Sequence, residues 1–524
     1  MRQNLIVTRR DLPQEEGKLT HIGPHTQAGL GKAFLTTGVF GRDGFGRYFA
    51  LVIIVIALCS LRTAAQTPDP QPPGRASDRA RPPLNPFPAE QDWSFLQDPS
   101  KRTDFYDPAK YIPLGDNPQY YISFGLEYRI EYEYFDNWML GAGPQDHNGY
   151  VMNRVMPHFD IHVGKWFRLF TELKFDYDSG RNGGPRPGID EDRGDVHQAF
   201  IEIGPDASGS RGVSLRAGRQ EVVLGSGRLL DNNEGPNVKL SFDGLRLITE
   251  TTHLRMDLFA LKPVEDDPGF FDDLPHHQET LWGAYFTVPA PITIQGQADL
   301  YYIGLDNKLV SYNRGTAREI RHTGGARIFR PIGHGFDYNW EANYQWGAFG
   351  NDSIRAWSVS TETGFTFYQT RFHPRPVLRA DAYSGDGGPA SHTLGTFDPL
   401  FPRGAYFSPK AVPTLSPQNL VDLHPLIQFQ LRSNITGAFA WDWYWRESTQ
   451  DGIYAFGSGL LIDPASVSRA HYLGTQGDIE IRWAPVSHII VAFNGGGFTP
   501  GPFFNNVTNN RGPIVFNTGL IYRF

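Results

Sequence analysis

Cysteine and long apolar runs are both scarce in this chain. The one cysteine among 524 residues, Cys59, lies inside the one long apolar run, residues 49–61. That run is shorter than the roughly 20 residues that a helix needs to cross a bilayer. Because it follows Arg47 and precedes small residues at 63–65, we predict a signal peptide over residues 47–65, with a buried core helix or membrane anchor as the alternative. Its removal would leave a mature chain without disulfide or thiol chemistry.

Basic residues do not outnumber acidic ones either. The chain has 56 acidic and 48 basic residues and a net charge of −8. This balance argues against a nucleic-acid partner, which demands a basic surface. Glycine is abundant, with 57 residues, and aromatic residues make up 14%. Such a composition favours short strands and turns over helices.

The domain organisation follows from changes in composition. Residues 1–46 show little periodicity, and we expect a spurious or disordered N-terminal extension there. Residues 66 to about 88 are rich in Pro, Asp and Arg, which predicts an extended periplasmic tail or linker. We assign residues 66–110 as a whole to a Pro-rich periplasmic tail. We assign residues 111–524 to an outer-membrane β-barrel.

Long segments of the chain alternate between apolar and polar residues. In residues 120–135, Tyr, Ile, Phe and Leu occupy one face, and Ser, Gly, Glu and Arg dominate the other. An alternation of this length with aromatics at both ends is typical of a tilted strand that crosses a membrane. Similar alternations occur in residues 165–178, 292–302, 336–347 and 435–446. The polar faces carry charges of both signs, as a water-filled lumen allows.

The connections between these segments alternate between short and long, which is the asymmetry expected between periplasmic turns and extracellular loops. The fold class is therefore all-β: a single antiparallel transmembrane β-barrel of about 18 strands. A barrel of this size encloses an aqueous channel. One strand departs from the pattern, because Val213 and Leu215 share parity with Arg219, and we expect a bulge or strand end between them.

The C-terminal segment, residues 514–524, has an apolar face that ends on Phe524. A free edge strand of this kind would be prone to aggregation, whereas an apolar face suits a strand that meets lipid. A terminal Phe resembles the assembly signal of bacterial outer-membrane barrels. Outer-membrane lipid and, through Phe524, the barrel-assembly machinery are therefore expected partners. We predict that this strand pairs with residues 120–135 and closes the barrel.

Several segments go beyond general barrel patterning. They read GRQEVVLGSGRLLD at 218–231, SFDGLRL at 241–247, DAYSGD at 381–386, GTFDPLFP at 395–402 and DPAKYIPL at 107–114. Together they resemble the alginate-export family of outer-membrane porins over roughly residues 92–524. The resemblance implies a narrow conduit lined by arginines with acidic partners.

Candidate pore-lining residues come from two sources. Those within the matching segments are Arg219, Arg228, Arg246, Asp231, Asp243, Asp381 and Asp386. Those placed by lumen parity alone are Arg129, Arg154, Arg168, Asp176 and Asp178. Guanidinium groups in series bind carboxylates through paired hydrogen bonds, so that a polyanion moves without being trapped.

The sequence thus predicts an outer-membrane channel for an anionic or saccharide-like solute, including an alginate-like polyuronate. The alternative is a general diffusion porin, because the predicted lumen mixes both charge signs. An enzyme is not expected: Asp176 and Asp178 share a face, but no Gly-x-Ser-x-Gly motif accompanies them. A plugged receptor is not expected either, since residues 66–110 are short and Pro-rich.

No cofactor or metal site is predicted. The acidic pairs at 266–267 and 272–273 and the histidines at 276–277 lack the spacing of a ligand set.

Overall fold

The computed structural model describes residues 81–141, 144–186, 188–204, 212–290, 295–333, 335–388, 390–404, 415–455, 459–462, 468–504 and 511–524. The predicted extension, the signal peptide and the first part of the predicted tail lie outside these residues. Within them, no helix is long and apolar enough to cross a membrane.

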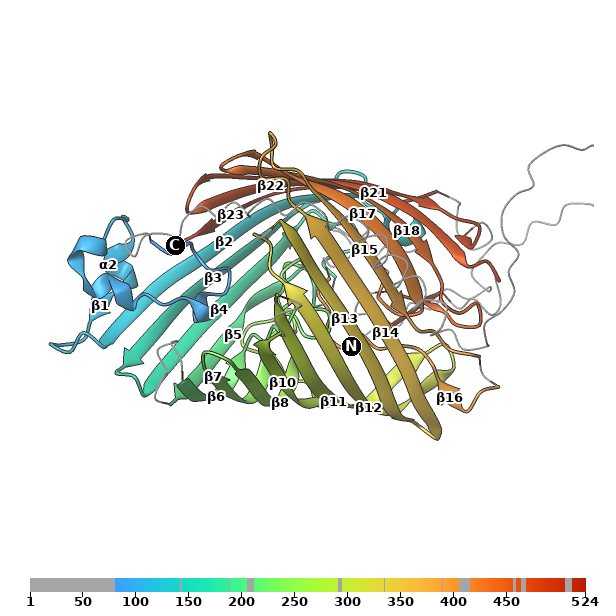
Figure 1. Ribbon diagram of the computed structural model, residues 1–524, viewed down its shortest axis with the longest axis horizontal. Helices are drawn as coiled ribbons and strands as arrows, with labels where there is room; N and C mark the ends of the chain where they lie inside the picture. Colours follow the sequence, from blue (N-terminus) through green and yellow to red (C-terminus); the bar gives the residue numbers. More distant parts are fainter. Residues whose placement is uncertain are drawn as a thin grey trace, which may run out of the picture. The chain divides into compact units, whose positions relative to one another are not determined.

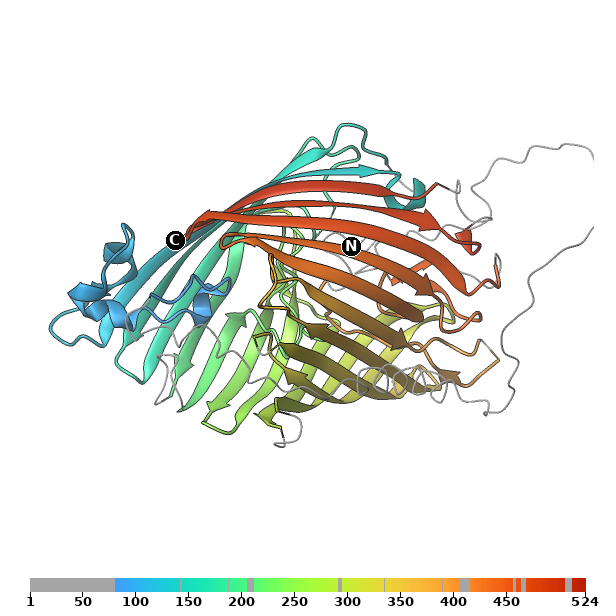
Figure 2. The ribbon, with the colours of Figure 1, turned by 45° about the horizontal axis from the view of Figure 1, so that its top comes forward.

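Eighteen long strands form a closed antiparallel barrel, as predicted. Figures 1 and 2 show them inclined side by side around the barrel. They are β2 (Tyr120–Asp136), β3 (Tyr150–Val163), β4 (Phe167–Ser179), β5 (Asp192–Ile203), β6 (Gly212–Gln220), β7 (Phe242–Glu250), β8 (Arg255–Glu265), β10 (Glu279–Pro289), β11 (Gln297–Tyr312), β12 (Gly315–Arg330), β13 (Phe336–Phe349), β14 (Asp352–Phe365), β15 (Arg375–Tyr383), β17 (Leu420–Arg432), β18 (Ile435–Trp445), β21 (Tyr472–Val486), β22 (Ile489–Pro500) and β23 (Ile514–Arg523).

Shorter elements decorate this barrel. Three two-residue strands, β1 (Ile112–Pro113), β9 (Leu274–Pro275) and β16 (Thr393–Leu394), extend the main sheet, and β19 (Ile453–Ala455) pairs with β20 (Gly459–Ile462) in a separate hairpin. The described helices are η2 (Pro88–Glu90), η3 (Ser94–Gln97), η4 (Pro99–Lys101), α2 (Asp107–Lys110) and η5 (Trp138–Gly141).

The predicted closing pair is confirmed. β23 pairs with β2 in antiparallel register from Glu127↔Arg523 to Asp136↔Ile514. The Arg523 guanidinium contacts the Glu127 carboxylate at 2.6 Å, and the Phe524 backbone exchanges two hydrogen bonds with Leu126. Closure pairs the backbone groups that a free edge would expose, which is the requirement for a sheet in lipid.

Side chains alternate between the two faces of the wall. In β2 the outward Phe124 is 44% exposed, whereas the inward Arg129 is 4% exposed. The exposed side chains of Leu245, Leu300 and Trp441 continue this apolar outer surface. The predicted strand at 292–302 is placed differently, because β11 runs over Gln297–Tyr312 and residues 291–294 lie outside the described part.

The irregularity predicted in β6 takes another form. The register of β6 with β5 and β7 runs without a bulge through Arg219. Gly218 and Gly244 instead face each other across β6 and β7, both with positive φ. A Cβ at either position would collide with a carbonyl of the neighbouring strand, so both positions require glycine.

The second part of the predicted tail, residues 88–110, forms a series of short helices. Its short helices are held by a cluster in which Trp93, Leu96 and Tyr111 are buried with Tyr121 of the barrel. Asp107 fixes the next turn by accepting hydrogen bonds from the backbone of Thr103 and Asp104. A few aromatic and aliphatic side chains thus hold this part of the tail against the barrel.

Two loops of the chain fold into the lumen of the barrel. Residues 221–241, between β6 and β7, and residues 384–404, which follow β15, contribute Leu224, Leu230 and Phe397 to a buried apolar cluster with inward side chains of the barrel. The loops therefore narrow the wide channel that an 18-stranded barrel would otherwise enclose.

Candidate functional site

The loop formed by residues 221–241, here called the crossing loop, is held to the wall at β2 and β3. The Arg129 guanidinium donates hydrogen bonds to the carbonyl oxygens of Glu234 (3.0 Å) and Pro236 (2.6 Å). Arg154, which is fully buried, contacts the carboxylates of Glu234 and Glu127, both at 2.6 Å. Two predicted pore arginines thus tether the loop by one end.

The other part of the crossing loop reaches β13, which lies eight strands from β2 by the shorter way around the barrel and so almost opposite it. Arg228 contacts the Glu341 carboxylate at 2.8 Å, and Ser226 donates to the same group at 3.1 Å. Directly before Ser226 the backbone turns at Gly225, with φ +60°, where a Cβ would collide with the Tyr285 hydroxyl. Glycine is therefore required for this close approach to the wall.

A second loop meets the crossing loop inside the barrel. The backbone nitrogen of Asp231 donates to the Phe401 carbonyl, and the nitrogen of Phe401 donates to the Leu229 carbonyl, both at 2.9 Å. The backbone nitrogen of Arg403 donates to the Gly227 carbonyl at 2.8 Å. We call this junction of the two lumen loops, residues 227–231 with 401–403, the constriction.

The charges of the crossing loop are paired. Lys239 contacts Glu221 at 3.2 Å and Glu234 at 2.8 Å. Burial raises the pKa of Glu221, but the Lys239 ammonium and a hydrogen bond with His197 outweigh it and lower the pKa to about 2. Burial raises the pKa of Asp231, although its carboxylate contacts Arg403 at 3.4 Å and accepts a hydrogen bond from the Asn233 backbone at 3.1 Å. The Arg403 side chain is 47% exposed, so its guanidinium retains access to water.

A second group of arginines lies where short turns join the strands, the end expected to face the periplasm. Arg168 of β4 contacts Asp160 at 2.8 Å, Arg216 of β6 contacts Glu202 at 2.8 Å, and Arg246 of β7 contacts Asp257 at 2.6 Å. The N-terminal segment reaches this row, since the Ala89 carbonyl accepts a hydrogen bond from Arg168 at 2.6 Å.

Glu90 adds a carboxylate to this row and lies 3.4 Å from Arg216. Desolvation inside the barrel acts to raise the pKa of Glu90, whose side chain is still 46% exposed, but Arg216, Arg246 and Arg168 outweigh it and lower the pKa to about 2. Glu90 is therefore ionised beside the arginine row throughout the physiological pH range.

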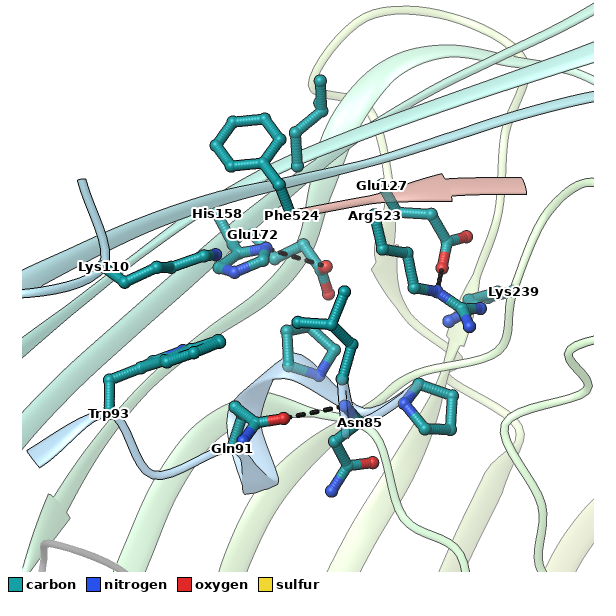
Figure 3. Close-up of a pocket in the computed structure, with 14 residues that line it drawn as sticks. Asn85, Gln91, Trp93, Lys110, Glu127, His158, Glu172, Lys239, Arg523 and Phe524 are labelled. Carbon is teal, nitrogen blue, oxygen red and sulfur yellow. Dashed lines mark hydrogen bonds and ion pairs between the residues drawn. The ribbon is translucent and has the colours of Figure 1, made fainter. Parts of the chain in front are cut away.

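A cavity lies beside this segment, between the N-terminal residues and the inner wall near the closing strand. In Figure 3 the Lys110 side chain extends toward His158 and Glu172. The Lys110 ammonium lies 5.0 Å from the centre of the Trp93 ring and 5.1 Å from that of Phe524. Burial lowers the pKa of Lys110 to about 7.

The predicted site residues do not form one site. Arg129, Arg154, Arg228 and Asp231 meet at the crossing loop and the constriction, whereas Arg168 and Arg246 belong to the arginine row. Asp176 faces inward on β4, in register with Arg154, and Asp178 follows it on the same strand. Asp381 faces inward on β15 and accepts a hydrogen bond from the Thr361 backbone.

Three predicted residues lie elsewhere. Arg219 and Asp243 pair with each other at 3.0 Å. Arg219 shares the outer face of β6 with Leu215, and Asp243 shares that of β7 with Leu245. Asp386 binds Arg314, in the connection between β11 and β12, at 2.8 Å. These three residues were predicted because they lie in the family-like segments. Arg219 and Asp243 are kept away from the constriction by strand parity, and Asp386 by its position in a loop.

The sequence analysis missed Arg216, Glu234, Lys239, Arg403 and Glu90. Strand parity would have found Arg216, which shares a face with the buried Ser214. The other four lie outside the long strands, where no periodicity shows which way a side chain points.

A closed 18-stranded barrel with an apolar outer face and inward-folded loops defines a porin-like channel of the bacterial outer membrane. The family model for alginate export matches residues 120–516, and the chain belongs to this family. No curated protein matches the chain.

Solved structures support the fold. A BenF-like porin from Pseudomonas fluorescens Pf-5 is similar with a TM-score of 0.53 and 9% identity, covering 77% of this chain and 98% of that one. OccD3 (OpdP) of Pseudomonas aeruginosa has a TM-score of 0.52 and 10% identity, covering 84% of this chain and 99% of that one. At such low identity the similarity concerns the barrel fold alone.

Proposed function

We propose that this outer-membrane channel passes an anionic, saccharide-like solute, with a polyuronate as the model cargo. The observation that carries the proposal is the position of Arg403, a half-exposed guanidinium at the junction of the two lumen loops. A planar guanidinium binds a carboxylate through two parallel hydrogen bonds, which suits a uronate residue.

Further arginines supply contacts in series. Arg129 and Arg154 lie where the crossing loop meets the wall, and Arg168 and Arg216 lie nearer the short-turn end. Acidic partners hold most of these guanidinium groups in place and weaken their field. Several sites of moderate affinity are what conduction requires, because a single strong site would retain the solute.

A general diffusion pore is the second candidate, and the extent of ion pairing favours it. Arg154, Arg168 and Arg246 are each buried against a carboxylate. A buried arginine–carboxylate pair has little net charge and therefore attracts a passing anion only weakly. Such a pore would conduct many solutes without saturation.

Planar-bilayer recordings of the purified protein distinguish the two candidates. We expect anion-selective reversal potentials and a current block by oligouronates that saturates with concentration. Arg403→Gln should weaken this block about threefold to tenfold, the equivalent of roughly 1 kcal/mol for one partly exposed charged contact. Arg318→Gln is the matched control, because Arg318 is 57% exposed and pairs with Asp306 on the outer face.

Neutral oligosaccharides of the same length supply the second control. Equal block by neutral and acidic sugars would overturn the anionic assignment. Cation selectivity together with an unchanged Arg403→Gln variant would favour the diffusion pore.

A further inference from the structure

Four groups of carboxylates and histidines in the described residues have ligand atoms close enough to share one ion. Three of them already contain a cation from the chain. Lys239 contacts Glu221 in the first, and Lys174 contacts Asp192, Asp266 and Asp273 in the second. The third shares Asp273, and therefore Lys174, with the second. These lysines take the place that a metal ion would otherwise fill.

The fourth group has a different environment. It consists of Asp422 and His424 on β17 and Asp442 on the neighbouring β18, exposed by 2%, 2% and 0%. Their ligand atoms all lie within 4.8 Å of one another, and Nδ1 of His424 is 2.5 Å from Oδ1 of Asp442. Among the described residues, no lysine or arginine forms an ion pair with Asp422 or Asp442.

Hydrogen bonds do not compensate for this burial. Neither carboxylate oxygen of Asp422 nor Nε2 of His424 has a hydrogen-bond partner within the described part of the chain. Asp442 lies beside the Tyr444 hydroxyl, on the same face of β18. Buried polar groups are normally satisfied, and an unsatisfied carboxylate is among the most costly.

Two further acidic side chains lie on the neighbouring strands. Asp381 of β15 is in direct register with Asp422, and Asp478 projects from β21 on the far side of β18. Arg379 of β15 is in register with His424, and it contacts Glu362 at 2.9 Å. Four acidic side chains thus face one part of the lumen wall across four neighbouring strands.

We propose that Asp422, His424 and Asp442 bind a divalent transition-metal ion of the zinc class on the inner wall. Two carboxylates and one imidazole are a mixed oxygen and nitrogen donor set, which suits zinc better than the all-oxygen shells of calcium and magnesium. Two carboxylates neutralise the ion, and three protein ligands leave a coordination position for water. This site does not depend on the cargo of the channel.

The test uses the full-length barrel purified in detergent, stripped with a chelator and titrated with Zn²⁺ alone by isothermal calorimetry. We expect one high-affinity equivalent in the native chain. Asp422→Asn and His424→Gln should each weaken binding at least tenfold. His197→Gln, in the group that contains Lys239, is the matched control and should leave the affinity unchanged.

A spectroscopic measurement keeps the test independent of folding defects in the variants. Co²⁺ added to the stripped native protein should give the visible absorption bands of a site with nitrogen and oxygen ligands, and Zn²⁺ should displace it. Absence of Zn²⁺ binding by the native chain would overturn the proposal and would mean that the two carboxyls are held protonated. Equal binding by the native chain and by correctly folded Asp422→Asn would also overturn it.

Discussion

Replacement of Arg154 by methionine is the sharpest test of how the crossing loop is held. The Arg154 side chain is fully buried and makes three hydrogen bonds to carboxylates, two to Glu127 and one to Glu234. A hydrogen bond to a charged group contributes about 1.5–3 kcal/mol. The substitution would therefore remove the principal ionic tether between the wall at β3 and the loop.

The net cost is smaller than the sum of these three bonds. Glu127 keeps Arg523 at 2.6 Å, and Glu234 keeps Lys239 at 2.8 Å, so neither acid is left without a cation. Glu234 is also 38% exposed, and water screens its contact. We expect a loss of about 3 kcal/mol in the free energy of unfolding.

Two measurements check this expectation. The denaturation midpoint in detergent should fall, and single-channel conductance should rise with added open-channel noise, because the loop gains freedom inside the lumen. Arg318→Met is the control, because Arg318 is 57% exposed and pairs with Asp306 on the outer face, and an exposed pair of this kind adds little to stability. An Arg154→Met channel with native conductance and a midpoint like that of the control would refute the tether.

Two further predictions concern the N-terminal segment. Glu90→Gln removes the carboxylate that lies against Arg216, so block by oligouronates added from the short-turn side should tighten severalfold in bilayer recordings, and unchanged block would show that Glu90 does not shield the row. Lys110 has a pKa of about 7 in the folded chain, below its ordinary value of 10.5, so the unfolded chain binds more protons between these values. Stability should therefore rise with pH from about 7 to 10, and Lys110→Met should flatten this rise in denaturation midpoints measured at successive pH values. An equal rise in the variant would assign the pH dependence to other groups.

Much of the barrel was predictable because lipid on one side and water on the other impose a period of two. That rule gave the strand number, the pairing of β23 with β2 and the inward position of Arg129 and Arg154. It fails where the chain leaves the wall. Nothing in residues 221–241 shows that they turn into the lumen, because their contacts are backbone carbonyls and side chains from distant strands.

The same limit explains the other departures. Arg219 lies in a segment typical of the family, yet its pairing with Asp243 is set by the register of β6 and β7. The metal-type group on β17 and β18 was missed because His424 and Asp442 are far apart in sequence and meet only through strand pairing. Sequence spacing finds ligands on one element, whereas a barrel brings them together across two.

The two proposals meet in the charge of the lumen wall. The inner faces of β2, β3, β4, β6 and β7 carry Arg129, Arg154, Arg168, Arg216 and Arg246, and those of β15, β17, β18 and β21 carry Asp381, Asp422, Asp442 and Asp478. On the first wall, carboxylates beside most of these arginines offset their charge. On the second wall, the carboxylates of Asp422 and Asp442 have no cation beside them within the described residues and would repel an anionic solute. A divalent ion bound by two carboxylates brings their local charge to zero and so reduces that repulsion.

The contributions of the two walls to anion selectivity can be measured separately. Chelation of the metal should lower anion selectivity while the arginines stay unchanged, and Arg403→Gln should lower it while the metal stays bound. If the two sites share no partner, the two losses should add, because distant and independent sites are additive in free energy. A loss of selectivity on chelation that persists in Asp422→Asn would instead place the relevant metal elsewhere in the channel.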